Sequence, residues 1–203
     1  MSSPSSSASD TVKAEPPRIM RGLKDVYFER SSATFIDGKA GELRYRGYSI
    51  HDLAQHSTFE ETAYLLLLGE LPTAAQLEGF DASLRAARSL PPAVLEIIDK
   101  VKTAHPMEVL RTAVSALGAF DPDTQDGSRE ALLRKGIRLT SQVPMIVAAH
   151  HRMRQGQAPV APAPDLGHAA NFLWMVKGEV PSADAAHLMD TDFILHAEHG
   201  TNA

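Results

Sequence analysis

The hydrophobic and polar positions of this chain follow one period near its beginning and another along the rest. Within Thr34–Tyr48, apolar residues flank a turn rich in Asp and Gly, which predicts a short β-hairpin with a loop of several residues. Beyond it the signals are helical. Ser57-Thr-Phe-Glu60 reads as a capping box that opens a helix over 59–68, and Gly69 stands where a left-handed C-terminal residue is expected.

Further helices are predicted from the same punctuation, at about 73–89, 93–103, 106–120, 128–154, 166–177 and 182–199. In the helix predicted at about 106–120, one face would carry Val109, Ala113, Leu117 and Phe120. Pro144 is expected to kink or break the long helix. Residues 155–164 hold three prolines and are predicted to be a connector. No internal repeat and no strand–helix alternation occurs, so the expected fold class is all-α with a short N-terminal β-hairpin.

Composition removes several function classes. Among 203 residues, 20 are basic and 25 acidic, whereas a protein dedicated to the nucleic-acid backbone needs a basic excess. There is no cysteine, which excludes disulfides, thiolate zinc sites and iron–sulfur clusters. No run of about 18 apolar residues predicts a membrane helix. Residues 1–20 are rich in Ser and lack the apolar core of a secretion signal, so we expect a disordered tail and a cytoplasmic protein.

Two histidines near the C-terminal end form the main candidate site. His196 and His199 stand three apart, on roughly one side of a helix, with Glu198 between them. They could recognise an anionic or carbonyl-bearing ligand, because imidazole donates hydrogen bonds and can carry charge near pH 7. They could instead cap the C-terminal end of a helix and interact favourably with the negative end of its dipole. A metal site is disfavoured, because two histidines do not complete a ligand shell.

Other polar residues favour structural roles. His150 and His151 are predicted to lie on a solvated helix end, and His105 is expected in a capping turn before Pro106. Arg44 and Arg46 could hold a carboxylate, but exposed arginines are common on hairpins and this second interpretation is favoured. The aromatic side chains of Phe172 and Trp174 are core candidates by their helical spacing.

Five motifs in order give the chain a resemblance. They are 35-FIDGKAGELRYRGY-48, 59-FEETAYLLLLGELP-72, 105-HPMEVLRTAVSALG-118, 171-NFLWM-175 and 195-LHAEHGTN-202. Together they resemble the N-terminal half of citrate synthases, in the branch of shorter bacterial and archaeal enzymes shared with 2-methylcitrate synthases. The resemblance covers about residues 22–203. It implies a predominantly helical fold with a large and a small domain, normally in a homodimer.

The resemblance also implies an acyltransferase that condenses acetyl-CoA with oxaloacetate to give citrate and CoA, with no metal or other cofactor. In that family the second histidine of the H-x-[DE]-H-x-x-N stretch contacts oxaloacetate, and here it is His199. Asn202 matches the asparagine and would shape the same pocket. His196 matches the first histidine and would support it.

The residues that perform catalysis in the family are expected downstream of Ala203. These are the aspartate that removes a proton from the acetyl methyl group, the histidine of a G-P-x-H-G-G stretch, and the arginines that hold the carboxylates. Residues 21–203 are therefore predicted to be the N-terminal part of the large domain, truncated and without the small domain. Two alternatives remain: a 2-methylcitrate synthase that uses propionyl-CoA, and a short non-catalytic relative that acts as a dimerisation or regulatory partner.

Overall fold

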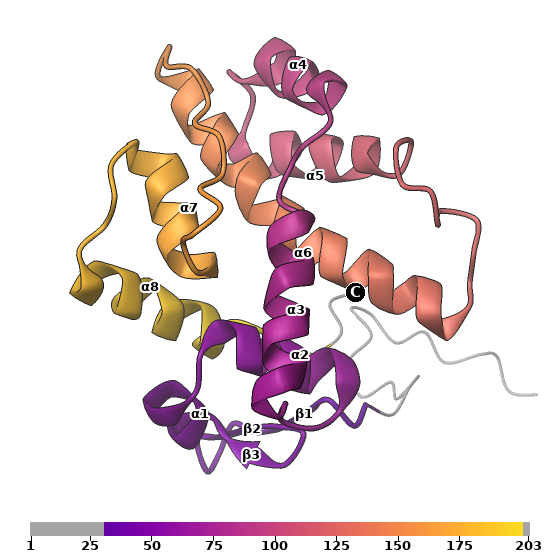
Figure 1. Ribbon diagram of the computed structural model, residues 1–203, viewed down its shortest axis with the longest axis vertical. Helices are drawn as coiled ribbons and strands as arrows, with labels where there is room; N and C mark the ends of the chain where they lie inside the picture. Colours follow the sequence, from indigo (N-terminus) through magenta and orange to yellow (C-terminus); the bar gives the residue numbers. More distant parts are fainter. Residues whose placement is uncertain (1–30, 201–203) are drawn as a thin grey trace, which may run out of the picture. The chain divides into compact units, whose positions relative to one another are not determined.

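The computed structural model describes residues 31–200, which are mainly helical as predicted (Figure 1). Three short strands come first and eight helices follow within this part of the chain. The elements are β1 Thr34–Asp37, β2 Glu42–Tyr45, β3 Tyr48–Ser49, α1 Ile50–His56, α2 Phe59–Leu68, α3 Ala74–Ala86, α4 Pro92–Val101, α5 Pro106–Leu117, α6 Arg129–Arg154, α7 His168–Lys177 and α8 Ala183–Leu195. The predicted tail over 1–20 lies outside the described residues.

The predicted hairpin exists and continues into a third strand. β1 and β2 pair antiparallel, with Ile36 opposite Leu43, and β3 adds to the other edge of β2. The β2–β3 connection has two central residues with positive φ, Arg46 at 49° and Gly47 at 92°. Positive φ at both positions is the requirement of a type I′ turn. Arg46 is anchored there, because its guanidinium donates to the Leu66 carbonyl at 2.9 Å, so it is no ordinary exposed arginine.

Helix ends follow the predicted signals with one shift in register. α2 opens with a capping box formed by Thr58 and Glu61, one residue later than the Ser57–Glu60 box expected from sequence. α3 opens with a second capping box, formed by Thr73 and Gln76. Gly69 and Gly178 end α2 and α7 in the left-handed conformation, at φ 100° and 81°. A side chain with a Cβ adopts that conformation at a cost, which explains glycine at both ends.

The largest apolar cluster joins α4, α5 and α6. Its buried members are Val94, Ile98, Val109, Ala113, Leu117, Ile146, Ala149 and Met153. The predicted face of α5 is confirmed for Val109, Ala113 and Leu117. The prediction for Phe120 is wrong, because α5 ends at Leu117 and Phe120, which lies beyond that end, is 49% exposed.

Helix α6 bears on two further expectations. Pro144 does not break the helix, which runs from Arg129 to Arg154 although proline has no N–H to give to the carbonyl four residues earlier. His150 is buried rather than solvated, and its Nε2 lies 3.1 Å from the Lys102 carbonyl. His151 is exposed as predicted. His105 caps α5 as expected, and its Nδ1 accepts from the Met107 amide at 3.2 Å.

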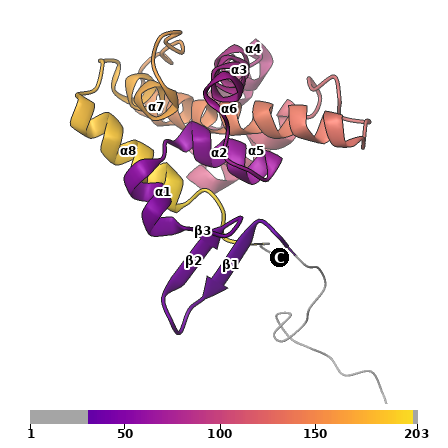
Figure 2. The ribbon, with the colours of Figure 1, turned by 60° about the horizontal axis from the view of Figure 1, so that its bottom comes forward.

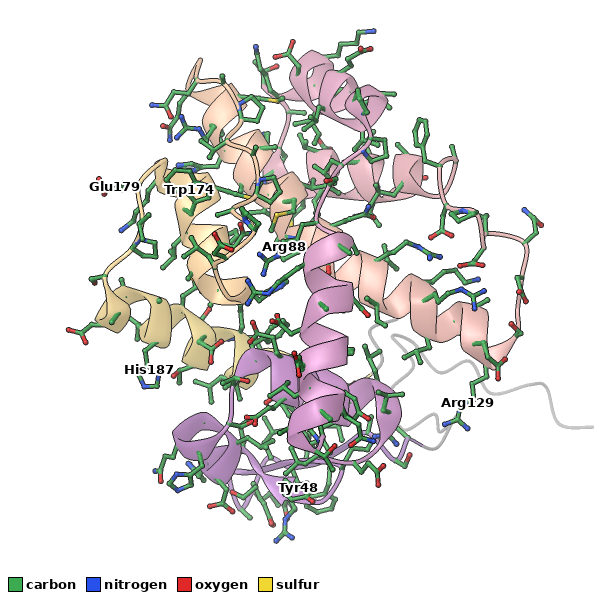
Figure 3. The ribbon with its side chains drawn as sticks, viewed as in Figure 1. Tyr48, Arg88, Arg129, Trp174, Glu179 and His187 are labelled. Carbon is green, nitrogen blue, oxygen red and sulfur yellow. The ribbon has the colours of Figure 1, made fainter. Side chains whose placement is uncertain are left out.

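Helices α7 and α8 pack together, and α7 also packs on α6. Arg88, at the end of α3, points to the segment before α7, where Nη1 donates to the carbonyls of Ala163 and Leu166 (Figure 3). Phe172 packs in an apolar cluster with Met145 and Met175, as its spacing predicted. Among the described helices, none is long and apolar enough to cross a membrane.

Candidate functional site

The C-terminal end of α8 reaches the small sheet, and this contact places the candidate histidines (Figure 2). Ile194, in the last turn of α8, is fully buried in a cluster with Tyr45 of β2 and with Leu53 and Leu65 of α1 and α2. Elements that are about 150 residues apart in sequence thus form one apolar anchor. The chain leaves this anchor at Leu195 and turns through residues 196–200, which we call the histidine turn.

His196 occupies the C-cap position of α8, as the capping interpretation predicted for it. The helix ends at Leu195 and not near residue 199, so the prediction that His196 and His199 share one side of a helix is wrong. Its Nδ1 lies 2.9 Å from the Asp192 carbonyl and 3.5 Å from the Asp192 carboxylate. Because a carbonyl only accepts, this contact requires a hydrogen on Nδ1. The imidazole therefore points back to the helix that precedes it, which fits a supporting role.

A single phenol hydroxyl spans the start of the histidine turn. The Tyr45 hydroxyl donates to the Leu195 carbonyl at 3.1 Å and accepts from the Glu198 amide at 3.2 Å. The Tyr45 side chain is fully buried, and burial raises the pKa of its hydroxyl. The Glu198 carboxylate in turn accepts from the amide of Gly200, where φ is 82°. Both groups hold the backbone on either side of His199.

The His199 imidazole is the free group of this turn. It is exposed, and within residues 31–200 it has no hydrogen-bond partner. Its neighbours in sequence are tied down by hydrogen bonds, so the backbone is held while the side chain faces outward. Such a side chain can meet a ligand without first breaking a bond of its own. Asn202, the other predicted binding residue, lies outside the described residues.

A separate cavity of about 580 Å³ lies between α2, α3, α7 and α8. Carboxylates and imidazoles line it beside several alanines, namely Glu60, Glu78, Asp81, Asp190, His168 and His187. Neither His196 nor His199 lines this cavity. Its walls are joined by two carboxylates that serve as helix caps. Glu60 accepts from the His168 amide at 2.8 Å, and Asp190 accepts from the Phe59 amide at 3.2 Å.

Burial shifts the pKa of two groups that line this cavity. Burial raises the pKa of Asp190 to about 6, against the lowering effect of the Phe59 amide. Burial also lowers the pKa of His168 to about 4, and the charge of Arg88 acts in the same direction. His168 is only 1% exposed and stacks on Phe59, with ring centroids 4.7 Å apart. Neither ring nitrogen has a hydrogen-bond partner among the described residues.

Sequence reasoning did not identify Tyr45, His168 or Asp190. Tyr45 carries no signal beyond a strand pattern, and its partners lie about 150 residues away. Asp190 is one acid among several on α8, and only the contact with α2 distinguishes it. His168 could have been noticed as a histidine in the apolar stretch 166–176. Within residues 31–200, no group of three or more His, Asp or Glu could hold a metal ion.

The fold and the sequence match known proteins. The family model described as citrate synthase, C-terminal domain, matches residues 22–203. The solved citrate synthase of Pyrobaculum aerophilum superposes with a TM-score of 0.85 at 42% identity, covering 89% of this chain and 47% of that one. The Thermoplasma acidophilum citrate synthase was solved as a ternary complex with carboxymethyl coenzyme A and oxaloacetate. It superposes with a TM-score of 0.86 at 26% identity, covering 92% of this chain and 49% of that one.

Sequence relatives agree with the structures. A citrate synthase of Deinococcus radiodurans is 46% identical over 186 residues, which cover 91% of this chain and 49% of the relative. A 2-methylcitrate synthase of Mycobacterium tuberculosis is 42% identical over 190 residues, which cover 93% of this chain and 48% of the relative. The chain therefore belongs to the citrate synthase family. It spans about half the length of the curated relatives it matches.

Proposed function

We propose that this chain supplies the N-terminal half of an enzyme that condenses acetyl-CoA with oxaloacetate to give citrate and CoA. The observation that supports the proposal is the histidine turn, where an exposed His199 stands on backbone fixed on both sides. The relative from Thermoplasma acidophilum, which shares this fold, was solved with oxaloacetate and a coenzyme A derivative. The family resemblance assigns the oxaloacetate contact to the position of His199.

The proposed task of His199 is to hold oxaloacetate and polarise its ketone. A hydrogen bond from the imidazole to the ketone oxygen would stabilise the negative charge that develops there as the new carbon–carbon bond forms. Asn202 would shape the same pocket, and His196 would support the turn from its C-cap position. Removal of the methyl proton from acetyl-CoA is assigned by resemblance to residues that this chain does not contain.

The proposal is tested by completing the chain. Residues 1–203 are fused to the part of the Deinococcus radiodurans citrate synthase that lies beyond the matched region. Release of free CoA thiol is then measured with acetyl-CoA in the presence and absence of oxaloacetate. We expect oxaloacetate-dependent release from the fusion and none from the 203-residue chain alone. A fusion that folds and binds neither substrate would contradict the proposal, and would favour a non-catalytic partner of the same family.

A pair of histidine variants tests the assignment within the fusion. His199→Ala is expected to lower kcat/KM by at least about 100-fold, because a group that polarises the ketone is lost. His151→Ala is the matched control, because His151 is also an exposed histidine close to a helix end. Equal activity of the two variants would remove His199 from the site.

The identity of the acyl group is a second proposal. The 42% identity to a 2-methylcitrate synthase keeps propionyl-CoA as the alternative substrate. One additional methylene changes discrimination by only about 1–3 kcal/mol in an apolar pocket. The ratio of kcat/KM for the two thioesters should therefore be measured in the natural full-length enzyme, because a fusion would import the pocket of another protein. A ratio in favour of propionyl-CoA would assign the alternative.

The remaining features of the proposed enzyme follow from the family. We propose a homodimer when the chain is complete, a cytoplasmic location, and a reaction that needs no metal or other cofactor. The described residues expose Leu132, Leu139 and Val147 on α6, which supports association of this face with further protein. Sedimentation of the complete protein checks the dimer. Activity that survives extensive chelation checks the metal-free reaction.

A further inference from the structure

We propose that Tyr45 is a positioning residue for substrate binding, because its hydroxyl fixes the backbone turn from which His199 projects. The inference rests on the proposed function for the substrate itself. Its structural basis is independent, since it depends only on contacts within residues 45–200. We assign Tyr45 no contact with the proposed ligand. It acts through the histidine turn.

The Tyr45 hydroxyl lies between the end of α8 and the histidine turn. An α-helix leaves its last carbonyls without intrahelical partners, and Leu195 is the last residue of α8. The Tyr45 hydroxyl donates to that carbonyl and accepts from the amide of Glu198, the residue before His199. One oxygen atom thereby joins the end of the helix to the turn that follows it. Together the two bonds hold the two intervening residues, His196 and Ala197, in this path.

Burial of the Tyr45 side chain makes its hydroxyl hard to replace. Tyr45 is fully buried, so water does not reach its side chain to replace the hydroxyl when it is removed. Burial raises the pKa of the hydroxyl, so it keeps the hydrogen that it gives to Leu195 at neutral pH. A phenylalanine ring would fill the same space against Ile194 and Leu53 but would leave both backbone groups without this partner.

The apolar anchor and the histidine turn are held by different kinds of contact. Ile194 and the apolar cluster fix the last turn of α8, and Ala197 packs against the same cluster. Apart from the Tyr45 hydroxyl, the buried side chains of this cluster are apolar and give residues 196–199 no directional hydrogen bond. The His196 side chain bonds backward to Asp192, so it restrains the helix end and not the path beyond it. On the sheet side, the Tyr45 hydroxyl therefore adds two directional hydrogen bonds to the apolar packing of Ala197.

The test compares Tyr45→Phe with Tyr48→Phe. Tyr48 lies opposite Tyr45 in the sheet register, but it is exposed and points outward (Figure 3). In the 203-residue chain, the Glu198 amide is followed by hydrogen exchange with NMR detection. Tyr45→Phe should accelerate its exchange by about tenfold, the effect of losing one hydrogen bond, and Tyr48→Phe should leave it unchanged.

The functional readout uses the completed fusion. Tyr45→Phe should raise KM for oxaloacetate by about tenfold and leave KM for acetyl-CoA within about twofold, because a misplaced His199 affects one substrate. Leu53→Ala serves as a second control, since it weakens the same apolar anchor without changing the hydroxyl. A merely structural role of Tyr45 would make Leu53→Ala raise KM for oxaloacetate as much as Tyr45→Phe does.

The outcomes separate this inference from the proposed function. Inactivity of the unmodified fusion would contradict the proposed function, while faster exchange of the Glu198 amide in Tyr45→Phe would still support the positioning of the turn. An active fusion whose KM for oxaloacetate does not respond to Tyr45→Phe would overturn the inference and leave the function intact. Unchanged exchange of the Glu198 amide would overturn it as well.

Discussion

The apolar cluster of α4, α5 and α6 and the interface of α2, α7 and α8 stabilise the same chain by different means. In the first region, methyl and methylene groups interdigitate at helical spacing, and every buried member of the cluster is apolar. In the second, two helix N-termini are capped by carboxylates from other helices. Glu60 caps α7 over a separation of 108 residues, and Asp190 caps α2 over 131 residues.

The difference shows where the fold is robust and where it is specific. An apolar cluster tolerates substitutions that preserve volume, because its attraction is not directional. The polar interface depends on single atoms, because an amide or imidazole without a partner loses the hydrogen bonds that water would supply. The histidine turn depends on the second kind of contact, through Tyr45. The following predictions change one region at a time, beginning with the largest expected effect.

Truncation in the apolar cluster should give the largest loss of stability. Ile98→Ala, in the fully buried centre of α4, is expected to lower the free energy of unfolding by about 2–5 kcal/mol. Urea unfolding followed by fluorescence of Trp174, the single tryptophan, measures the change. Leu188→Ala is the control, because Leu188 is 72% exposed on α8, and it should change stability by less than about 0.5 kcal/mol. Equal losses in the two variants would contradict the assigned core.

A histidine substitution should have the opposite sign in the polar interface. His168→Phe retains the contact with Phe59 and removes two buried nitrogens that lack partners, so we expect a gain of about 1–3 kcal/mol at pH 7. His150→Phe is the matched control, since His150 is buried with a partner at the Lys102 carbonyl. That variant should lose about 1 kcal/mol. A loss of stability in both variants would show that His168 is satisfied after all.

The same variant should change the pH dependence. The pKa of His168 falls to about 4 on folding, so the unfolded chain binds the proton more readily. The protein should therefore lose stability as pH falls from 6.5 towards 4, by up to about 3 kcal/mol from this group. His168→Phe should abolish that loss. An unchanged slope of unfolding free energy against pH would contradict the low pKa.

The next prediction concerns Asp190, the other titrating group of the interface. The pKa of Asp190 rises to about 6 on folding, so its contribution is favourable at acid pH and is lost as pH rises from about 4 to 6. Asp190→Asn keeps an acceptor for the Phe59 amide and should gain about 1 kcal/mol at pH 7, after allowance for partial solvent screening, and nothing at pH 4. Asp192→Asn, on the exposed side of α8, should gain nothing at either pH. A gain from Asp190→Asn that persists at pH 4 would assign its effect to something other than charge.

The two regions were also unequally predictable from sequence. Periodicity identified Val109, Ala113 and Leu117, because a face repeated over three turns averages out local exceptions. It failed at Phe120, which lies one turn past the helix end, and at the capping box, where Ser57 and Thr58 offer the same chemistry one residue apart. Pro144 was expected to kink or break α6, and the break does not occur, because helix geometry continues on both sides of the missing hydrogen bond.

The candidate site was predictable only as far as its motif. The family pattern pointed to His196 and His199, and the capping interpretation of His196 agrees with the structure. Tyr45, Asp190 and Glu60 were not found, because each acts on a residue more than 100 positions away and no local pattern encodes such a partner. His150 and His168 show the same limit, because burial decided their role and sequence spacing did not.

The smallest effect is expected at the ion pairs of the loop between α5 and α6. Burial pushes the pKa of Asp121 upward, but hydrogen bonds from Arg138 and from the Asp123 amide outweigh it and lower the pKa. The favourable contribution of Asp121 is thus present above about pH 4 and is lost as pH falls below its lowered pKa. Arg138→Gln should cost no more than about 1 kcal/mol at pH 7, because these groups remain partly solvated. The loss should shrink in 1 M salt and vanish at low pH, whereas the effect of Ile98→Ala should persist under both conditions. A loss from Arg138→Gln that is independent of salt would place this pair with the buried contacts of the α2–α7–α8 interface.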